Sequence, residues 1–331
     1  MPRHRVLLTD YAWDDLAIET EILKQAGAEI VLPESGSEAA LAAAAADCDA
    51  IMNNWAPVTA SVIDAAPRCR IIARLGIGLD SIDVKRATAR GIPVTNVPDY
   101  CLVEVAEHAL ALIFACGRKV AWYHWETKQG KYDLKSGAEL LRMEGQTLGI
   151  VGLGAIGRKL AEKAAALGLR VVATSRSRPA APSGVAYVEL DQLLAESDYV
   201  SLHVPLTPET RQLMGAAQLA RMKPTAYLIN TARGGLIDHD ALAAALNAGQ
   251  LAGAALDVQQ PEPPDLSRPP FTDPRVIVTP HAAFVSRQSL VDLRQRASHQ
   301  VADRLSGRLP AHVVNPEVFT VNPEVFTSPA G

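Results

Sequence analysis

The segment LGIVGLGAIGRKLAEKAAALG, residues 148–168, constrains the fold more than any other stretch. An apolar run leads into Gly152, Gly154 and Gly157, and a helical pattern follows at once. In a strand–loop–helix unit the first glycine permits a tight turn, the second lets a pyrophosphate approach the backbone, and the third lets helix and strand pack. The phosphate then meets the helix N-terminus, with Ala155 and Ile156 beside it. A glycine turn without a ligand is the alternative interpretation.

Strand-like and helical segments alternate along most of the 331 residues, which is typical of parallel α/β domains. The first series is RVLLTD, DLAIETEILKQAGA, EIVLP, DAIMNNW, TASVIDAAP and CRIIARLGIGLD. The second contains six strand candidates: LGIVG, RVVATS, DYVSLHVP, TAYLINTA, AGAALDV and RVIVTP. We predict a dinucleotide-binding domain over 100–285, inserted into a substrate domain made of 1–99 and 286–331. Two consecutive domains with a boundary near 140 are the alternative.

Composition limits the class of protein. The formal charge of −4 gives no support for a general nucleic-acid surface. No apolar run reaches the roughly 18 residues of a membrane span, and the N-terminus lacks a secretory core. Four scattered cysteines without CxxC spacing indicate free thiols in a reducing cytoplasm. We therefore expect a cytoplasmic protein with no metal site and no nucleic-acid or membrane partner.

The end of the second strand of the dinucleotide unit departs from the common pattern. A carboxylate that grips the ribose is expected there, but the chain has the sequence TSRSR. Ser175 removes the repulsion of a 2′-phosphate, and Arg176 and Arg178 offer forked donors to it. The segment favours NADP(H) as cofactor, with NAD(H) as the alternative if these residues form only a solvated basic loop.

Three polar segments follow strand candidates, where an open α/β sheet places its ligand. They are LINTARGGLID, ALDVQQPEPP and VIVTPHAAF. Arg233 suits the binding of a ligand's carboxylate, because its planar guanidinium stays charged and can donate two hydrogen bonds. His281 suits proton donation, and Glu262 could pair with and orient that ring.

The order and spacing of these motifs resemble the D-isomer-specific 2-hydroxyacid dehydrogenases over nearly the whole chain. Within that family, VLLTDYAWDDLAIETEILKQAGAEIV and GIPVTNVPDYCLVEVAEHALALI look most like the branch of C-terminal-binding-protein-like dehydrogenases. The resemblance implies two Rossmann-like, doubly wound parallel-sheet domains with the active site in the cleft between them, and a homodimer formed through the nucleotide domain. It gives Arg233, Glu262 and His281 the roles argued above, with Arg233 and His281 contacting substrate.

Further site residues follow from the resemblance alone. Backbone N–H groups near the glycines of CRIIARLGIGLD would meet the substrate carboxylate, and a second loop could face the substrate, although its tryptophan could equally be plain packing. One aspartate would hydrogen-bond the nicotinamide carboxamide. His108, on an amphipathic helix, is interpreted as a packed histidine. The substrate residues are Leu75, Gly76, Ile77, Asn54 and Trp55, and the cofactor residues are His203, Pro205, Thr210, Thr231, Ala232 and Asp257.

Together these features predict a cytoplasmic, NADPH-preferring D-2-hydroxyacid dehydrogenase that reduces a small 2-oxo acid such as glyoxylate or hydroxypyruvate by direct hydride transfer. The alternative from another class is a dinucleotide-sensing, corepressor-like scaffold, which would retain the same catalytic residues. A specialised enzyme for an unusual acid is a further alternative. The tail repeats VNPEVFT at 314–320 and 321–327, and we predict no function for it.

Overall fold

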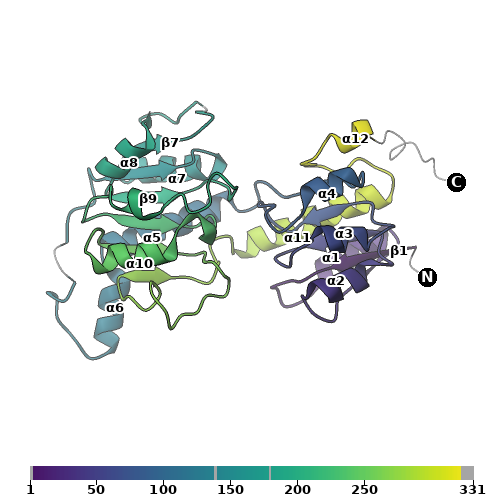
Figure 1. Ribbon diagram of the computed structural model, residues 1–331, viewed down its shortest axis with the longest axis horizontal. Helices are drawn as coiled ribbons and strands as arrows, with labels where there is room; N and C mark the ends of the chain where they lie inside the picture. The colour runs from purple at the N-terminus through teal and green to yellow at the C-terminus, as the bar shows by residue number, and fades with distance from the viewer. Residues whose placement is uncertain (1–2, 138–139, 179, 322–331) are drawn as a thin grey trace. The chain divides into compact units, whose positions relative to one another are not determined.

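Figure 1 shows a computed structural model of the chain, which describes residues 3–137, 140–178 and 180–321. The chain groups into two compact units. The first contains residues 1–100 and 286–331, and the second contains residues 101–285. Nearly all of the second VNPEVFT copy lies outside the described residues.

The first unit contains a five-stranded sheet in the order β2-β1-β3-β4-β5, and every pair of neighbours is parallel. Its strands are β1 His4–Leu8, β2 Ala28–Val31, β3 Ala50–Asn53, β4 Ile72–Arg74 and β5 Val94–Thr95. Its helices are α1 Ala17–Gln25, α2 Glu38–Ala45, α3 Ala60–Asp64, α4 Val84–Ala89, α11 Arg287–Leu305 and α12 Val318–Val321. The strand and helix candidates of the first series therefore form one doubly wound sheet.

Helices cover both faces of this sheet, so its strands are apolar on both sides (Figure 1). Val6 and Leu8 of β1 pack in one cluster with side chains of α1 and α11, such as Leu23 and Leu293. Leu7, which points the other way, packs with residues of α2, α3 and α4. The last long helix thus completes a core that the first third of the chain begins.

The first VNPEVFT copy is part of the first unit's core. The side chain of Asn315 accepts a hydrogen bond from the N–H of Val94 at 2.8 Å and donates to Thr88 Oγ1 at 2.9 Å. Val318 is fully buried. This copy therefore has a structural role beside β5.

The second unit contains a seven-stranded parallel sheet in the order β12-β11-β10-β9-β6-β7-β8. Its strands are β6 Thr147–Val151, β7 Arg170–Thr174, β8 Ala186–Tyr187, β9 Tyr199–Leu202, β10 Tyr227–Asn230, β11 Gly253–Leu256 and β12 Val276–Val278. Its helices are α5 Leu102–Gly117, α6 Val120–Lys128, α7 Ala155–Ala166, α8 Leu190–Glu196, α9 Ala216–Leu219, α10 His239–Asn247 and the 3₁₀ turn η1 Gly234–Leu236. All six strand candidates of the second series are confirmed, and the two-residue β8 was missed.

The strand order of the second unit reverses between β6 and β9, which makes this the topological switch point of the sheet. Helices α5 and α7 pack on one face, and α8, α9 and α10 pack on the other. Because all seven strands are parallel, the loops at their carboxyl ends share one edge. Ligands of such sheets bind at that edge.

No helix among the described residues is both long and apolar enough to cross a membrane. The described residues also contain no cluster of His, Cys, Asp and Glu side chains suited to a metal ion. The four cysteines are free thiols and all are buried.

Candidate active site

The predicted catalytic and cofactor residues all lie at the carboxyl edge of the second unit's sheet. Each group follows a different strand, so the fold collects residues that are more than 100 positions apart in the sequence. Gly152, Gly154, Ala155, Ile156 and Gly157 follow β6, and Ser175, Arg176 and Arg178 follow β7. His203, Pro205 and Thr210 follow β9, Thr231, Ala232 and Arg233 follow β10, Asp257 and Glu262 follow β11, and His281 follows β12.

The glycine loop has the geometry that its spacing predicts. Gly152 has φ +101°, and a Cβ there would lie 2.6 Å from the carbonyl oxygen of His203. A Cβ at Gly157 would overlap the carbonyl oxygen of Gly152, so that glycine permits the close approach of α7. Gly154, at the N-terminus of α7, has open space where its Cβ would be. The loop therefore leaves room for a pyrophosphate at a helix N-terminus.

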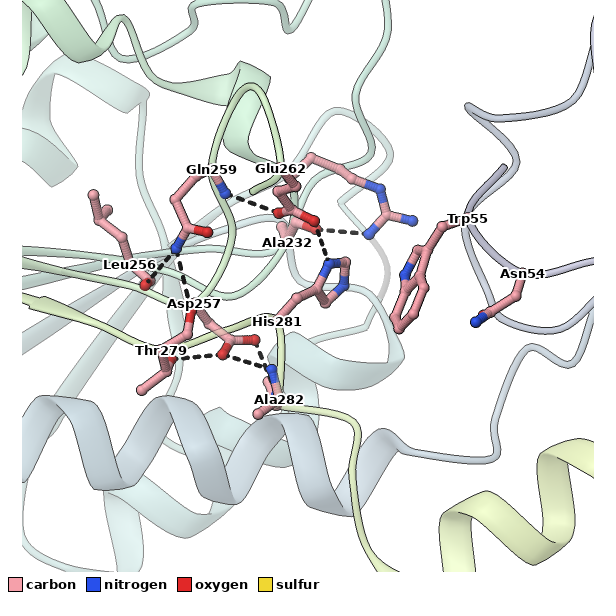
Figure 2. Close-up of polar contacts among 12 residues, drawn as sticks. Asn54, Trp55, Ala232, Leu256, Asp257, Gln259, Glu262, Thr279, His281 and Ala282 are labelled. Carbon is pink, nitrogen blue, oxygen red and sulfur yellow. Dashed lines mark hydrogen bonds and ion pairs between the residues drawn. The ribbon is translucent and has the colours of Figure 1, made fainter. Parts of the chain in front are cut away.

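His281 and Glu262 form a hydrogen-bonded pair. The Nδ1 atom of His281 lies 2.8 Å from Oε2 of Glu262, as Figure 2 shows. The N–H of Gln259 donates to the other carboxylate oxygen at 2.9 Å. Burial acts to raise the pKa of Glu262, but its hydrogen bond to His281, the nearby charges of His281 and Arg233, and the Gln259 amide together hold that pKa below its ordinary value. Glu262 is thus held as a carboxylate, which accepts a hydrogen bond from the ring.

A buried asparagine shapes the loop that carries Arg233. Asn230, at the end of β10, is fully buried; its side chain accepts from the N–H of Ala232 at 3.0 Å and donates to the carbonyl oxygen of Arg233 at 2.8 Å. Arg233 itself donates to the carbonyl oxygen of Ala232 at 2.7 Å and contributes positive charge near Glu262. Sequence reasoning missed Asn230, although a polar residue that ends an apolar strand is a signal that could have identified it.

Asp257 accepts several hydrogen bonds within its own unit. Its carboxylate is fully buried and accepts from Thr279 Oγ1 at 2.6 Å and from the N–H groups of Ala282 and Ala283 at 2.9 Å each. Figure 2 shows its hydrogen bonds to Thr279 and Ala282, on either side of His281 in the chain. Through these bonds the aspartate anchors the turn that carries His281, and its hydrogen bond to a nicotinamide carboxamide stays a prediction.

Two other histidines lie near this edge and differ in their surroundings. Nε2 of His203 lies 2.8 Å from Ser201 Oγ, and burial lowers the pKa of His203 to about 4, so it is a neutral ring. Nε2 of His108, on α5, lies 3.1 Å from Thr279 Oγ1 and 3.4 Å from Asp257 Oδ1. The interpretation of His108 as merely packed overlooked these contacts, because its sequence position gives no sign of a partner 171 residues away.

The segment after β7 lies at the part of the carboxyl edge where the ribose is expected, which we call the ribose end, and it is exposed. Arg178 has φ +40° and forms an ion pair with Glu189, and the two side chains are 52% and 79% exposed. Arg176 contributes positive charge near Glu209. The predicted phosphate donors therefore lie at the right strand end, but one of them already has an acidic neighbour that the sequence pattern did not reveal.

The remaining predicted cofactor residues fall into two kinds. Thr231 is buried, and its hydroxyl oxygen has no hydrogen-bond partner in the described residues. The hydroxyl of Thr210, in contrast, donates to the carbonyl oxygen of Pro205 at 2.6 Å and accepts from the N–H of Thr207 at 2.8 Å. Thr231 thus has a buried hydroxyl without a partner in the described residues, whereas Thr210 fixes the loop after β9.

The predicted substrate residues lie at the carboxyl edge of the first unit's sheet, after β3 and β4. Asn54 is buried, and its Nδ2 atom has no hydrogen-bond partner in the described residues. Trp55 is exposed, and its N–H donates to the carboxylate of Asp10 at 2.9 Å. The N–H of Leu75 donates to the carbonyl oxygen of Asn53 at 2.7 Å, and its contact with substrate stays a prediction.

Gly76 and Ile77 are the other candidate amides of this loop. Gly76 has φ +154°, and a Cβ there would lie 2.9 Å from Cζ of the buried Arg74. Glycine is therefore favoured at this position, where a side chain would strain the backbone. Arg74 also donates to the carbonyl oxygen of Gly78 at 3.0 Å, and this hydrogen bond stabilises the loop.

Comparison with known proteins identifies the family. The sequence model described as "D-isomer specific 2-hydroxyacid dehydrogenase, NAD binding domain" matches residues 110–283, more than half of the chain. The chain belongs to the D-isomer-specific 2-hydroxyacid dehydrogenase family. A glyoxylate reductase of Korarchaeum cryptofilum is 42% identical over 288 residues, which cover 83% of this chain and 85% of that protein.

Solved structures of the family share the fold of this dehydrogenase chain. An NADPH-dependent glyoxylate/hydroxypyruvate reductase from Sinorhizobium meliloti, in complex with NADP and malonate, superposes with a TM-score of 0.84 and 30% identity over 95% of this chain and 97% of that one. A D-lactate dehydrogenase from Aquifex aeolicus, complexed with NAD and lactic acid, superposes with a TM-score of 0.83 and 27% identity. That match covers 94% of this chain and 99% of the other. Two parallel-sheet α/β domains and a nicotinamide dinucleotide cofactor are therefore characteristics that this chain shares with its family.

Proposed function

We propose that this protein is an NADP(H)-preferring D-2-hydroxyacid dehydrogenase that reduces a small 2-oxo acid such as glyoxylate or hydroxypyruvate. The observation that carries the proposal is the 2.8 Å contact between His281 Nδ1 and Glu262 Oε2, at the sheet edge that also holds the glycine loop. It is supported by the glyoxylate reductase relative and by the glyoxylate/hydroxypyruvate reductase structure.

The residues present fit a dinucleotide. The open space at Gly154 suits the pyrophosphate at the N-terminus of α7, and the unpartnered hydroxyl of Thr231 suits a polar group of the cofactor. Ser175, Arg176 and Arg178 suit the 2′-phosphate, provided that Arg178 exchanges its contact with Glu189 for the ligand. Structures of relatives hold NADP in one case and NAD in another, so the preference is argued from this chain's own residues.

The proton has a defined place in this arrangement. When bound, the nicotinamide supplies the hydride. A carboxylate only accepts hydrogen bonds, so the Nδ1 atom that faces Glu262 carries a proton. Nε2 of His281 is then the atom that gives its proton to the new alkoxide during reduction and takes it back during oxidation. Glu262 orients the ring, and Arg233 binds the substrate carboxylate with a forked, permanent cation.

The substrate domain is proposed to be residues 1–99 and 286–331, which match the first unit except for Tyr100. Asn54 Nδ2 is a buried donor without a partner, and such a donor is costly unless a ligand meets it. The amides of Gly76 and Ile77 and the exposed ring of Trp55 are the other proposed substrate contacts. Asp10 holds the Trp55 loop through its bonds to the N–H groups of Trp55 and Ala56.

A homodimer formed through the second unit is proposed as the assembly. Large apolar side chains of that unit are exposed around α6 and the segment after it, which marks a surface that a second copy would cover. They are Val120, Trp125, Tyr132, Leu134 and Leu141. A cytoplasmic location is proposed from the four free thiols.

The proposed function is tested by steady-state reduction of glyoxylate, hydroxypyruvate, pyruvate and larger 2-oxo acids with NADPH and with NADH. We expect the highest kcat/KM for glyoxylate or hydroxypyruvate with NADPH. An enzyme that acts only on bulky 2-oxo acids would contradict the substrate class, and equal kcat/KM with NADH would contradict the cofactor preference alone.

A further inference from the structure

The turn that carries His281 depends on Asp257 for its shape. The backbone of His281 is in the left-handed region, with φ +52°, which a residue other than glycine adopts only when its surroundings hold it there. Its N–H donates to the carbonyl oxygen of Asp257 at 2.7 Å. The next two N–H groups, of Ala282 and Ala283, donate to the Asp257 carboxylate. One residue thus fixes three consecutive amides of the turn.

Thr279 and His108 extend this arrangement to α5. The hydroxyl of Thr279 has a single proton, and it donates that proton to Oδ1 of Asp257 at 2.6 Å. The Thr279 oxygen can therefore only accept from Nε2 of His108, which lies 3.1 Å away. Nε2 of His108 must carry a proton, and this holds whether the ring is neutral or charged. His108 is thus a fixed donor to the hydroxyl, 3.4 Å from the buried carboxylate.

We propose that His108 is a positioning residue for the reaction. Through Thr279 and Asp257 it holds the turn at 279–283 and keeps the ring of His281 against Glu262. We call the hydrogen-bonded series His108, Thr279 and Asp257 the relay. The charged groups near it are Asp257 itself and, at the His281 ring, Glu262 and Arg233. The inference rests on the proposed function, because it gives His108 its importance through the proton donor.

Packing alone would predict something different. Most buried neighbours of His108 along α5, such as Val105, Ala109 and Leu112, are apolar, so leucine would fill a position that is only packed. Leucine has no donor, however, and would leave the Thr279 oxygen without its bond. Glutamine can place its amide nitrogen near the position of Nε2, and it should preserve the relay.

The test uses the full-length enzyme and the variants His108→Leu and His108→Gln. Two measurements are made: kcat and KM for glyoxylate with NADPH, and the NMR resonance of the His281 Nδ1 proton, which is identified by its loss in His281→Asn. A single hydrogen bond contributes about two- to tenfold to an equilibrium, so we expect His108→Leu to lower kcat by about that factor. The KM for NADPH should change little, the ring-proton signal should broaden or shift, and His108→Gln should restore both.

Thr279→Val and Thr279→Ser test the same relay without changing α5, and they serve if His108→Leu does not fold. Thr279→Val should lower kcat and disturb the ring-proton signal as His108→Leu does. Thr279→Ser should match the parent in both measurements. An unchanged ring-proton signal in both His108→Leu and Thr279→Val would overturn the proposal, whatever happens to turnover. A disturbed signal with unchanged turnover would support the positioning role and contradict instead the assignment of His281 as proton donor.

Discussion

The two ends of the carboxyl edge in the second unit hold their polar side chains in different ways. At the acid–base end, Asp257 is fully buried, and the His281 and Glu262 side chains are 24% and 33% exposed and hydrogen-bonded to each other. At the ribose end, the side chains of the Arg178–Glu189 pair are 52% and 79% exposed.

This difference has a physical consequence. A hydrogen bond between partly buried groups keeps its geometry and is only weakly screened by solvent. An exposed ion pair contributes little to stability, is screened by salt, and can be replaced by contacts with a ligand. We therefore expect substitutions at the acid–base end to change turnover, and substitutions at the ribose end to change which cofactor is chosen.

The largest expected effect is at the proton donor. His281→Ala should lower kcat by about 10²–10⁴-fold, the usual contribution of general acid–base assistance. NADPH affinity should stay close to that of the parent, which equilibrium fluorescence titration would measure. Turnover near the parent value would contradict the assignment.

Arg233→Lys keeps the positive charge but loses the planar guanidinium, which can donate two hydrogen bonds to one carboxylate. Each charged hydrogen bond contributes about 1.5–3 kcal/mol, so loss of one should lower kcat/KM for the 2-oxo acid by roughly 10- to 100-fold. Steady-state kinetics at saturating NADPH would measure this. Kinetics that match the parent would mean that Arg233 does not bind the carboxylate in a forked manner.

At the ribose end, the double variant Ser175→Asp with Arg176→Ala should abolish or reverse the NADPH preference. The expected change in the NADPH/NADH ratio of kcat/KM is about tenfold or more, since one charged contact is lost and a repelling carboxylate is gained. Turnover with saturating NADH should hardly change. The parent's preference should also weaken as salt rises, because exposed charges carry it.

Glu189→Gln is the matched control for that variant. It removes the neighbour that holds Arg178, so it should leave the NADPH preference intact or strengthen it. If the double variant still prefers NADPH, or Glu189→Gln abolishes the preference, then the basic loop does not receive the 2′-phosphate.

The smallest expected effect is on the pH dependence of stability. The folded structure holds the pKa of Glu262 below its ordinary value of 4.5, so the charged form stabilises the fold above that value and the contribution is lost as pH falls through the lower, folded pKa. Relative to Glu262→Gln, the parent should be more stable by on the order of 1 kcal/mol at neutral pH. This difference should vanish in acid.

Urea unfolding at several pH values would measure this difference. Glu189→Gln, which disrupts an exposed pair, should show a much smaller one. A constant difference between the parent and Glu262→Gln across the pH range would contradict the coupling of Glu262 to His281.

The sequence predicted the fold well, and parts of the site less well, for a physical reason. The six strand candidates and Gly152, Gly154 and Gly157 are local patterns, and each reflects what neighbouring residues need from the backbone. The roles of Asp257 and His108 depend on contacts between segments far apart in the chain, and so does the pairing of Arg178 with Glu189. The hydrogen bond from the Leu75 N–H to Asn53, at the end of the adjacent strand, is a further contact that the local pattern does not reveal.

A double-mutant cycle between His281 and Glu262 tests the central claim that these residues act as one acid–base unit. The kcat for glyoxylate reduction with NADPH would be measured for the parent, Glu262→Gln, His281→Ala and the double variant. Groups that act as a unit are not additive, so Glu262→Gln should lower kcat in the parent and cause no further loss once His281 is alanine. The same fold loss in both backgrounds would contradict the account.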